Sequence, residues 1–327
     1  MASTNGMSRR RVLGLAGLGA ANAVLAACSK SNPSAAGGPM PGSSGSSGPS
    51  TSASPSDGLI RGSGKPVHVR LFQGDGTTWG VGMPIIAYLS ADIGDAHMWA
   101  KVSKVTVNGS TVDGAWFFQN SAVYPDYPVE ARYRLEDYWP ARADIRLDLP
   151  IKGLTAGPGL VFDNSLTLDM KTGARNISAI DGSTLRMNVT SDGAPAFTFP
   201  VSLGKAATPT FDGIKVVIDK AAVQRMVNTT PGQQYDLNVP WSVRVTNSGE
   251  FIHSASWNGG NIGTRSTSHG CTNLTEADAH KFFDFAQVGD VTVYSSTGGP
   301  TMPSWDGYGD WNLSFATWRA GGLYKTS

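Results

Sequence analysis

The sequence predicts a mainly β protein: an immunoglobulin-like β-sandwich followed by a second β-rich domain with one or two short helices. Short alternating runs of apolar residues recur from residue 66 to residue 295, and turn signals such as Asn108-Gly109 separate them. Forty glycines and 19 prolines supply further turns, and 40% of the 327 residues are apolar while 16% are charged. A chain of this length fits two domains of about 150 residues each, and its composition can build a core.

The first 27 residues have the pattern of an export signal. Three arginines at positions 9–11 precede an apolar run, 12–25, that lacks acidic residues and is too short for a comfortable membrane span. The arginines also fit a twin-arginine signal. The run ends at Leu25-Ala26-Ala27-Cys28, which resembles a bacterial lipobox, where the cysteine becomes the lipidated first residue. We expect a signal peptide over 1–27 and lipidation at Cys28; the alternative is an ordinary signal peptide with an incidental cysteine.

Residues 28–64 are predicted to form a flexible linker. They are mostly serine, glycine, proline, alanine and threonine, and so offer few side chains to bury. Together with Cys28, this segment predicts an exported protein that a lipid anchor holds at the outer face of the cytoplasmic membrane, in a periplasm-like space.

The first domain, residues 65–160, is predicted to be the immunoglobulin-like sandwich. Strands are expected at 67–71, 84–89, 102–107 and 143–149. Because no Cys-Trp-Cys signature is present, this prediction rests on the strand pattern alone. We interpret His68 and His97, which lie among strand or loop residues, as structural or surface residues and not as ligands.

The second domain, residues 161–296, continues the strands and contains one clear helix. Strands are expected at 165–170, 184–189, 197–203, 213–218, 241–246 and 291–294. Thr275 begins a capping-box-like sequence, an apolar stripe at helical spacing includes Ala279 and Phe282, and Gly289 marks the end. Residues 297–327 form a tryptophan-rich extension that we expect to pack across the domain junction.

Charge and cysteine content exclude several classes of protein. The formal net charge of +1 removes the electrostatic argument for a nucleic-acid binder. Two cysteines, Cys28 and Cys271, cannot make a disulfide-dense scaffold or a four-cysteine zinc site. An unpaired thiol in an exported protein invites oxidation, so the presence of Cys271 needs a reason.

Two histidines precede Cys271 in the sequence, at 18 and 2 residues' distance. A cysteine nucleophile needs a base for its proton and a third group to orient that base. His253 ends a predicted strand and is the better candidate base, whereas His269 is only two residues from the cysteine. Gly270 permits unusual backbone angles, so neighbouring N–H groups could face a developing oxyanion. Two alternatives stay open: a buried, unreactive cysteine, and a zinc site built from His253, His269 and Cys271.

The Ser-His-Gly-Cys-x-Asn sequence at 268–273, preceded by His253, resembles the signature of the L,D-transpeptidases, cysteine enzymes of bacterial cell walls. Further similarity lies in Val201-Ser202-Leu203-Gly204-Lys205 with Thr208-Pro209-Thr210, in Tyr138-Trp139-Pro140, and in Asp310-Trp311-Asn312 with Trp318-Arg319-Ala320-Gly321. These matches cover roughly residues 65–327 and resemble the lipoprotein branch of the family, which carries an immunoglobulin-like domain.

This resemblance implies peptidoglycan tetrapeptide stems as donor and acceptor. Cys271 would attack the carbonyl of the donor's third residue, release D-alanine and form a thioester that an acceptor amine resolves into a third-to-third cross-link. The resemblance makes His253 the base, the Ser254 carbonyl its orienting group, and His269 a residue that holds the site together. The implied oxyanion and substrate contacts are Gly270, Cys271, Tyr235, Ser248, Gly249 and Asn273, with Met226 and Trp257 at the flap and cleft rim.

The resemblance also implies that carbapenems acylate the same cysteine, and it implies no cofactor or metal ion. Three alternatives to cross-linking remain. The thioester could react with water, as in an L,D-carboxypeptidase, or with another D-amino acid in an exchange reaction. The chain could also be a non-catalytic, lipid-tethered protein that binds the wall.

Overall fold

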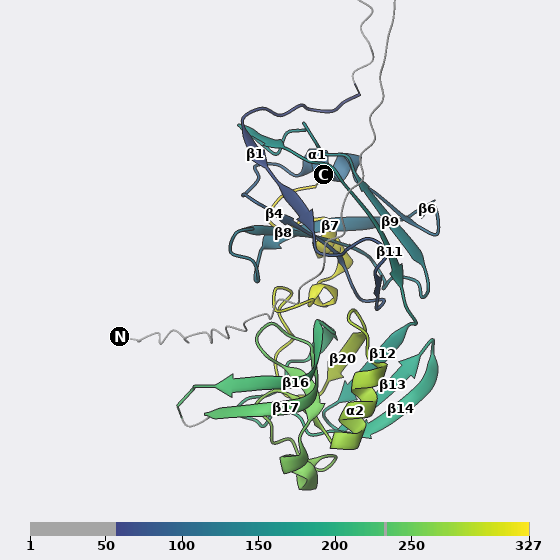
Figure 1. Ribbon diagram of the computed structural model, residues 1–327, viewed down its shortest axis with the longest axis vertical. Coiled ribbons are helices and arrows are strands. Elements are labelled where there is room, and N and C mark those ends of the chain that lie inside the picture. Colours follow the sequence, from purple (N-terminus) through teal and green to yellow (C-terminus); the bar gives the residue numbers. More distant parts are fainter. Residues whose placement is uncertain (1–56, 232–233, 327) are drawn as a thin grey trace, which may run out of the picture. The chain divides into compact units, whose positions relative to one another are not determined.

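The computed structural model describes residues 57–231 and 234–326 (Figure 1). The predicted signal peptide, Cys28 and most of the predicted linker lie outside the described residues. Among the residues described, no helix is both long enough and apolar enough to cross a membrane. The mainly β fold class is confirmed, with an immunoglobulin-like domain followed by a second β-rich domain.

The first domain is a sandwich of two sheets. One sheet has the order β2-β4-β8-β7, from β2 (Val69–Leu71), β4 (Ile85–Leu89), β8 (Val129–Leu135) and β7 (Gly114–Asn120). The other has the order β3-β11-β9-β5-β6, from β3 (Thr78–Trp79), β11 (Leu166–Thr172), β9 (Asp144–Leu149), β5 (Lys104–Val107) and β6 (Ser110–Thr111). A short parallel pair, β1 (Lys65–Val67) with β10 (Leu160–Phe162), and the helix α1 (His97–Val102) complete it. Trp99, Trp116 and Phe118 pack edge-on at the centre of its core.

The structure moves both expected boundaries of this domain. The strand expected at 165–170 in the second domain is β11, and it pairs along its length with β9 of the sandwich. The first domain therefore continues to about residue 173, where Gly173 N–H still donates to Trp79 O at 2.8 Å. At the other end, Gly62 N–H donates to Gly153 O at 3.0 Å, so the last residues of the expected linker already belong to the sandwich.

Both histidines of the first domain lie next to an aspartate. His68 lies within 3.1 Å of an Asp163 carboxylate oxygen, an acidic partner 95 residues away in sequence, although its side chain is exposed. His97 begins α1 instead of lying in a strand or loop, and its N–H donates to Asp95 Oδ1 at 2.7 Å. Their interpretation as structural or surface residues agrees with these contacts.

The second domain contains two sheets and one main helix (Figure 1). The first sheet has the order β14-β13-β12-β20-β15, from β14 (Ala194–Pro200), β13 (Arg186–Ser191), β12 (Asn176–Asp181), β20 (Val291–Ser295) and β15 (Gly213–Val216). The second has the order β16-β17-β18-β19, from β16 (Asp219–Asn228), β17 (Tyr235–Arg244), β18 (Phe251–Ser254) and β19 (Thr272–Leu274). The long strands β16 and β17 project from the rest of their sheet as a hairpin. A 3-10 helix, η1 (Ser256–Asn261), follows β18.

The predicted helix is confirmed as α2 (Glu276–Phe285). Thr275 is its N-cap, and the hydroxyl accepts from Asp278 N–H at 3.2 Å, as a capping residue should. Ala279 and Phe282 are buried on the face that contacts β17 and β18. The helix therefore braces the sheet that carries the cysteine and histidine sequences.

The C-terminal extension packs across the domain junction, as expected. It contains η2 (Asp310–Asn312) and α3 (Phe315–Arg319). Asn312 exchanges side-chain hydrogen bonds with the backbone of Ile214 in β15, and Trp318 Nε1 donates to Ala115 O in β7 at 2.8 Å. Asp310, which is fully buried, pairs with Arg132 of β8 at 3.1 Å.

Candidate active site

A cavity of about 550 Å³ opens between the β16–β17 hairpin and the segment that contains Cys271. The hairpin contributes Met226, Gln234, Tyr235, Leu237 and Val239, and the opposite side contributes His253, Trp257, Asn258, Thr267, Ser268, His269, Cys271 and Asn273. The cavity thus brings together the cysteine and both histidines that the sequence singled out.

Strand pairing explains how residues 18 positions apart meet. β18 and β19 are parallel neighbours, and His253 is opposite Asn273 in their register. Cys271 directly precedes β19, so it reaches the same end of the pair as β18 residues Phe251 and Ile252. The chain between them, including η1, makes the crossover that a parallel pair requires.

The Cys271 sulfur is held by the backbone on either side of Glu250. Its thiol donates to Gly249 O at 3.8 Å, and the Phe251 N–H points to the sulfur as a hydrogen-bond donor. Burial raises the pKa of the Cys271 thiol to about 12, with a further rise from the Glu250 charge. The cysteine is therefore a thiol, not a thiolate, at neutral pH.

His253 lines the same cavity as Cys271 and is a neutral imidazole. Its Nδ1 lies 2.6 Å from Ser254 O, and since a carbonyl can only accept, Nδ1 carries the hydrogen and Nε2 keeps its lone pair. Burial lowers the pKa of His253 to about 4. The ring of Trp257 stacks over that of His253 with centroids 6.0 Å apart. The Ser254 carbonyl thus orients the ring in the way the resemblance implies.

His269 and Tyr235 lie together at the other side of the cavity. The rings of the two residues are 5.6 Å apart, and Lys205 Nζ is 3.1 Å from His269 Nε2. This arrangement gives His269 a supporting place between the hairpin and the Lys205 segment. Lys205 is not among the expected site residues, yet it lies next to the cavity-lining His269.

The turn at Gly270 differs from the expected oxyanion arrangement. Its φ of +123° is in the region that favours glycine, which explains the residue type. However, the Gly270 N–H donates to Ser268 Oγ at 3.1 Å, while Ser268 Oγ itself donates to Cys271 O at 2.6 Å. The Gly270 N–H is therefore engaged inside the turn and becomes an oxyanion donor only if Ser268 releases it.

Two of the expected substrate contacts lie outside the cavity lining. Ser248 and Gly249 form the turn before β18, and Ser248 donates both its N–H and its hydroxyl to Asp306, at 2.6 and 2.5 Å. Asp306 belongs to the C-terminal extension and is 1% exposed. In this structure, Ser248 is a link between the extension and the turn that presents Gly249 O to the sulfur.

The remaining expected contacts do line the cavity. Asn273 is buried, and its Oδ1 has no hydrogen-bond partner among the described residues. Met226 packs with Val239, Phe251, Tyr235 and Cys271, so it serves both packing and lining. Trp257 is 57% exposed at the rim.

The geometry bears on both alternatives for Cys271, an unreactive buried cysteine and a zinc ligand. A cysteine that lines a cavity shared with a neutral imidazole is not simply a core residue. Within the part of the chain that the structure describes, no group of three histidine, cysteine or acidic side chains is arranged to hold a metal ion. Nucleophilic chemistry is what this arrangement favours.

Several residues around the site were not predicted from the sequence. Asp306, Glu250 and Lys215 are buried charges in or bonded to the turn before β18, which contacts the Cys271 sulfur. The available signal was a charged residue inside an apolar strand: Glu250 precedes Phe251-Ile252, and Lys215 lies within Gly213-Ile214-Lys215-Val216-Val217. Leu237, Val239, Asn258 and Thr267 gave no signal of this kind.

Comparisons with known proteins agree with this arrangement. Residues 175–294 match the family model of the L,D-transpeptidase catalytic domain, and residues 60–155 match that of a bacterial Ig domain. L,D-transpeptidase 2 of Mycobacterium tuberculosis is 32% identical over 267 residues, covering 78% of this chain and 63% of the relative. L,D-transpeptidase 5 of the same species is 30% identical over 250 residues, covering 75% and 54%. The chain thus spans only about half to six tenths of these relatives.

Solved structures share the fold. An L,D-transpeptidase from Mycobacterium smegmatis superposes with a TM-score of 0.57 at 25% identity, covering 71% of this chain and all of that one. LD transpeptidase LdtMt1 in complex with imipenem gives a TM-score of 0.58 at 24% identity, covering 72% of this chain and all of that one.

Proposed function

The chain carries an L,D-transpeptidase catalytic domain behind a bacterial Ig domain, and from that premise we propose that it forms third-to-third peptidoglycan cross-links through a thioester on Cys271. The observation that carries the proposal is the shared cavity of Cys271 and His253, which is lined by a thiol and by a neutral imidazole that the Ser254 carbonyl orients.

The first half-reaction is acylation. As Sγ attacks the carbonyl carbon of the third residue in a donor tetrapeptide stem, His253 Nε2 takes the thiol proton. The tetrahedral intermediate then collapses, its C–N bond breaks, and the amine of D-alanine leaves with the proton from His253. Because burial lowers the pKa of His253, its imidazolium is more acidic than an exposed one and returns the proton to the leaving amine.

The second half-reaction is deacylation. An acceptor amine attacks the thioester carbonyl and loses a proton to His253, and the proton returns to sulfur as the C–S bond breaks. The products are a new amide and the free thiol. The unpartnered Asn273 Oδ1 in the cavity wall offers an acceptor for a substrate N–H.

The apolar wall of the hairpin favours an amine over water as the acceptor. Met226, Leu237 and Val239 line the cavity on that side, and Trp257 lies at its rim. A wall of this kind limits the water around the thioester. Carboxypeptidase and exchange activities would use the same thioester, and a product analysis separates the three reactions.

We also propose that carbapenems acylate Cys271 and that Cys28 carries a lipid anchor. A solved relative of the same fold is in complex with imipenem. The Leu25-Ala26-Ala27-Cys28 sequence supports lipidation, with the linker as a tether that lets the catalytic domain search the wall while the Ig domain sets its height. Loss of labelled palmitate incorporation in Cys28→Ala, with retention in Cys271→Ala, is the expected result for the anchor.

Incubation with a tetrapeptide-stem fragment tests the cross-linking function. The wild type should release D-alanine and give a dimer joined between third residues, and Cys271→Ala should give neither. If the only product is the hydrolysed tripeptide, the enzyme is an L,D-carboxypeptidase and not a transpeptidase. Intact-protein mass spectrometry after imipenem exposure is the companion measurement. If the wild type gives no adduct, or if the adduct still forms in Cys271→Ala, Cys271 is not the nucleophile. The alternative of a non-catalytic, lipid-tethered protein that binds the wall would then be favoured.

A further inference from the structure

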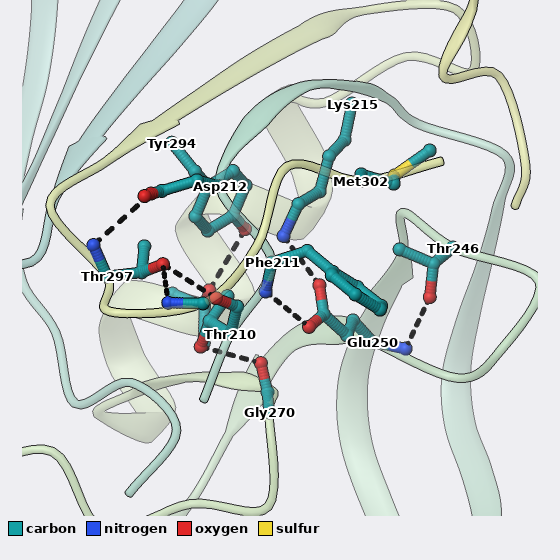
Figure 2. A network of polar contacts seen from close by, with 12 residues as sticks. Thr210, Phe211, Asp212, Lys215, Thr246, Glu250, Gly270, Tyr294, Thr297 and Met302 are labelled. Carbon is teal, nitrogen blue, oxygen red and sulfur yellow. Dashed lines mark hydrogen bonds and ion pairs between the residues drawn. The ribbon is translucent and has the colours of Figure 1, made fainter. Parts of the chain in front are cut away.

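A buried ion pair lies near Gly270, the residue before Cys271 (Figure 2). Lys215 of β15 is fully buried, and its Nζ is 2.5 Å from Glu250 Oε2. The ammonium also lies 3.6 Å from the centre of the Tyr294 ring. Because removing two charges from water costs several kcal/mol per ion before pairing, such a pair is weak support for stability alone. Its position suggests a different purpose.

The carboxylate lies next to the turn. A methyl group at Gly270 would lie 3.4 Å from Glu250 Oε1, at ordinary van der Waals distance, so little space separates the carboxylate from the turn. Figure 2 shows the segment that joins them: Phe211 N–H donates to Glu250 Oε1 at 2.8 Å, and Thr210 Oγ1 donates to Gly270 O at 2.8 Å. Adjacent residues of one segment therefore hold the carboxylate and the turn at a fixed distance.

The backbone of Glu250 is fixed as well. Its N–H donates to Thr246 Oγ1 at 2.8 Å, and its carbonyl accepts from Val245 N–H at 3.0 Å. Its two neighbours in the chain, Gly249 and Phe251, supply the carbonyl and the N–H that contact the Cys271 sulfur. Any shift of Glu250 would therefore move both backbone contacts of the nucleophile.

We propose that Lys215 and Glu250 are positioning residues of the active site, which fix the strand and the turn around the Cys271 sulfur and place a carboxylate charge beneath it. The inference rests on the proposed role of Cys271 as the nucleophile. It adds a second layer to the site, made of charges that touch neither substrate nor sulfur.

The electrostatics agree with this placement. Burial raises the pKa of Glu250 and lowers that of Lys215, so each residue keeps its charge only through the other. At Cys271, the Glu250 charge raises the thiol pKa and the Lys215 charge lowers it, with the carboxylate as the larger influence.

Other titratable groups surround the pair. His253 and His269 line the cavity with Cys271, and Tyr294 lies between Lys215 and Thr272, with its hydroxyl 2.9 Å from Thr272 Oγ1. The charges of Asp212 and Asp306 act on Lys215 and Glu250 respectively. Since these groups stay in place when the pair is altered, a change in the thiol titration of a pair variant reports the pair. Burial, with a smaller contribution from the carboxylate, keeps the resting cysteine protonated, and a protonated thiol is oxidised more slowly than a thiolate.

The test is the pH dependence of Cys271 alkylation by iodoacetamide in the full chain. Glu250→Gln removes the charge but keeps an acceptor for Phe211 N–H. Because the thiolate is the reactive form, we expect the alkylation profile to move to lower pH by about one unit, or about tenfold faster alkylation at neutral pH. Mass spectrometry locates the adduct on Cys271. An unchanged profile would overturn the proposal.

A paired variant and a matched control separate charge from folding. Lys215→Met with Glu250→Gln leaves no unpaired buried charge, so its melting temperature should exceed that of Glu250→Gln alone, while its alkylation stays faster than in the wild type. If the paired variant is alkylated at the same rate as the wild type, the ion pair has only a structural role. If Glu250→Gln does not fold, the paired variant alone provides the test.

The control is Asp310→Asn, which disturbs the buried ion pair with Arg132 at the domain junction. It should lower the melting temperature without moving the thiol profile, and an equal shift in this control would overturn the proposal. Alkylation needs no peptidoglycan substrate. A failure of the cross-linking proposal would therefore leave the thiol measurement intact, and the two failures are distinguishable.

Discussion

The two sides of the Cys271 cavity are built from very different strands. On one side, β18 and β19 bury every residue, and Ile252 and Leu274 have no exposed surface. On the other side, the β16–β17 hairpin exposes large apolar side chains, with Val223 at 61%, Val227 at 44% and Leu237 at 42%. Few buried contacts are typical of segments that open locally at low free-energy cost.

The difference separates two tasks. The β18–β19 side holds the thiol, the imidazole and the Ser254 carbonyl, groups whose chemistry depends on fixed geometry. The hairpin carries no proposed proton-transfer group, and its register partners Met226 and Leu237 share the face toward the cavity. Changes on the first side should therefore affect the rate of acylation, while changes on the hairpin side should affect which acceptor reacts.

The largest effect is expected for His253→Gln. Loss of a positioned base removes about 10²–10⁴-fold of rate from a proton-transfer step. Release of D-alanine from a tetrapeptide stem should fall by that factor, with little change in KM because the side chain acts on the thiol proton. His280→Gln, on the exposed face of α2, is the matched control and should retain wild-type turnover. If the His253→Gln enzyme releases D-alanine at a rate within a factor of three of the wild-type rate, His253 is not the base, and His269 becomes the candidate.

The same histidine should also make the folded state sensitive to acid. Its folded pKa of about 4 lies below the ordinary value near 6.5, so the unfolded chain binds the extra proton in this window and stability falls as pH falls from about 6.5 to 4. The shift corresponds to about 3 kcal/mol. Asp290 has the opposite sign, because its folded pKa is raised to about 6 and stability falls as pH rises through that range.

Denaturant unfolding at pH 7 and pH 4.5 isolates the histidine. The difference in free energy of unfolding between the wild type and His253→Gln should become smaller as pH falls, since the glutamine variant keeps Asp290 but has no imidazole to protonate. A difference that is constant between the two pH values would mean that His253 is not held neutral in the folded protein.

How much of this could be read from the sequence differs between the two sides. The strand, loop and turn that carry His253 and Cys271 follow from local signals: an apolar run, a glycine before the cysteine, and Thr275 as a helix cap. The hairpin side was not predicted as such. β16 alternates apolar and polar residues weakly, and its pairing partner β17 is recognisable only over residues 241–244 of the expected strand.

Contacts between distant segments could not be predicted either. Lys215 and Glu250 are 35 residues apart, and Ser248 and Asp306 are 58 apart, so no spacing rule joins them. The boundary near residue 173 was missed for the same reason: β11 alternates like its neighbours, and only its pairing with β9 assigns it to the sandwich. The engagement of the Gly270 N–H by Ser268 depends on the local backbone angle, which a glycine permits but does not specify.

A smaller effect is expected at the link between the C-terminal extension and the rigid side. Asp306→Asn weakens two hydrogen bonds to Ser248 and removes a buried charge, so Gly249 O should lose its fixed distance to the sulfur. We expect about a tenfold loss of kcat with a smaller change in KM. Ser248→Ala keeps the N–H bond to Asp306 and should lose less. If Ser248→Ala instead raises KM more than Asp306→Asn does, Ser248 contacts substrate directly.

The smallest effect on turnover, and the sharpest on product, is expected for Trp257→Ala at the rim. The side chain is 57% exposed, so its removal should change the free energy of unfolding by less than about 1 kcal/mol. It covers the His253 ring, however, and without it more water reaches the thioester. Total D-alanine release should change by a factor of about two to three, while the ratio of hydrolysed tripeptide to cross-linked dimer rises several-fold.

Val223→Ala, on the outer face of the hairpin, loses a comparably exposed apolar side chain away from the cavity and should leave that ratio unchanged. An equal product ratio in Trp257→Ala and the wild type would place the control of acceptor choice on the rigid side of the cavity.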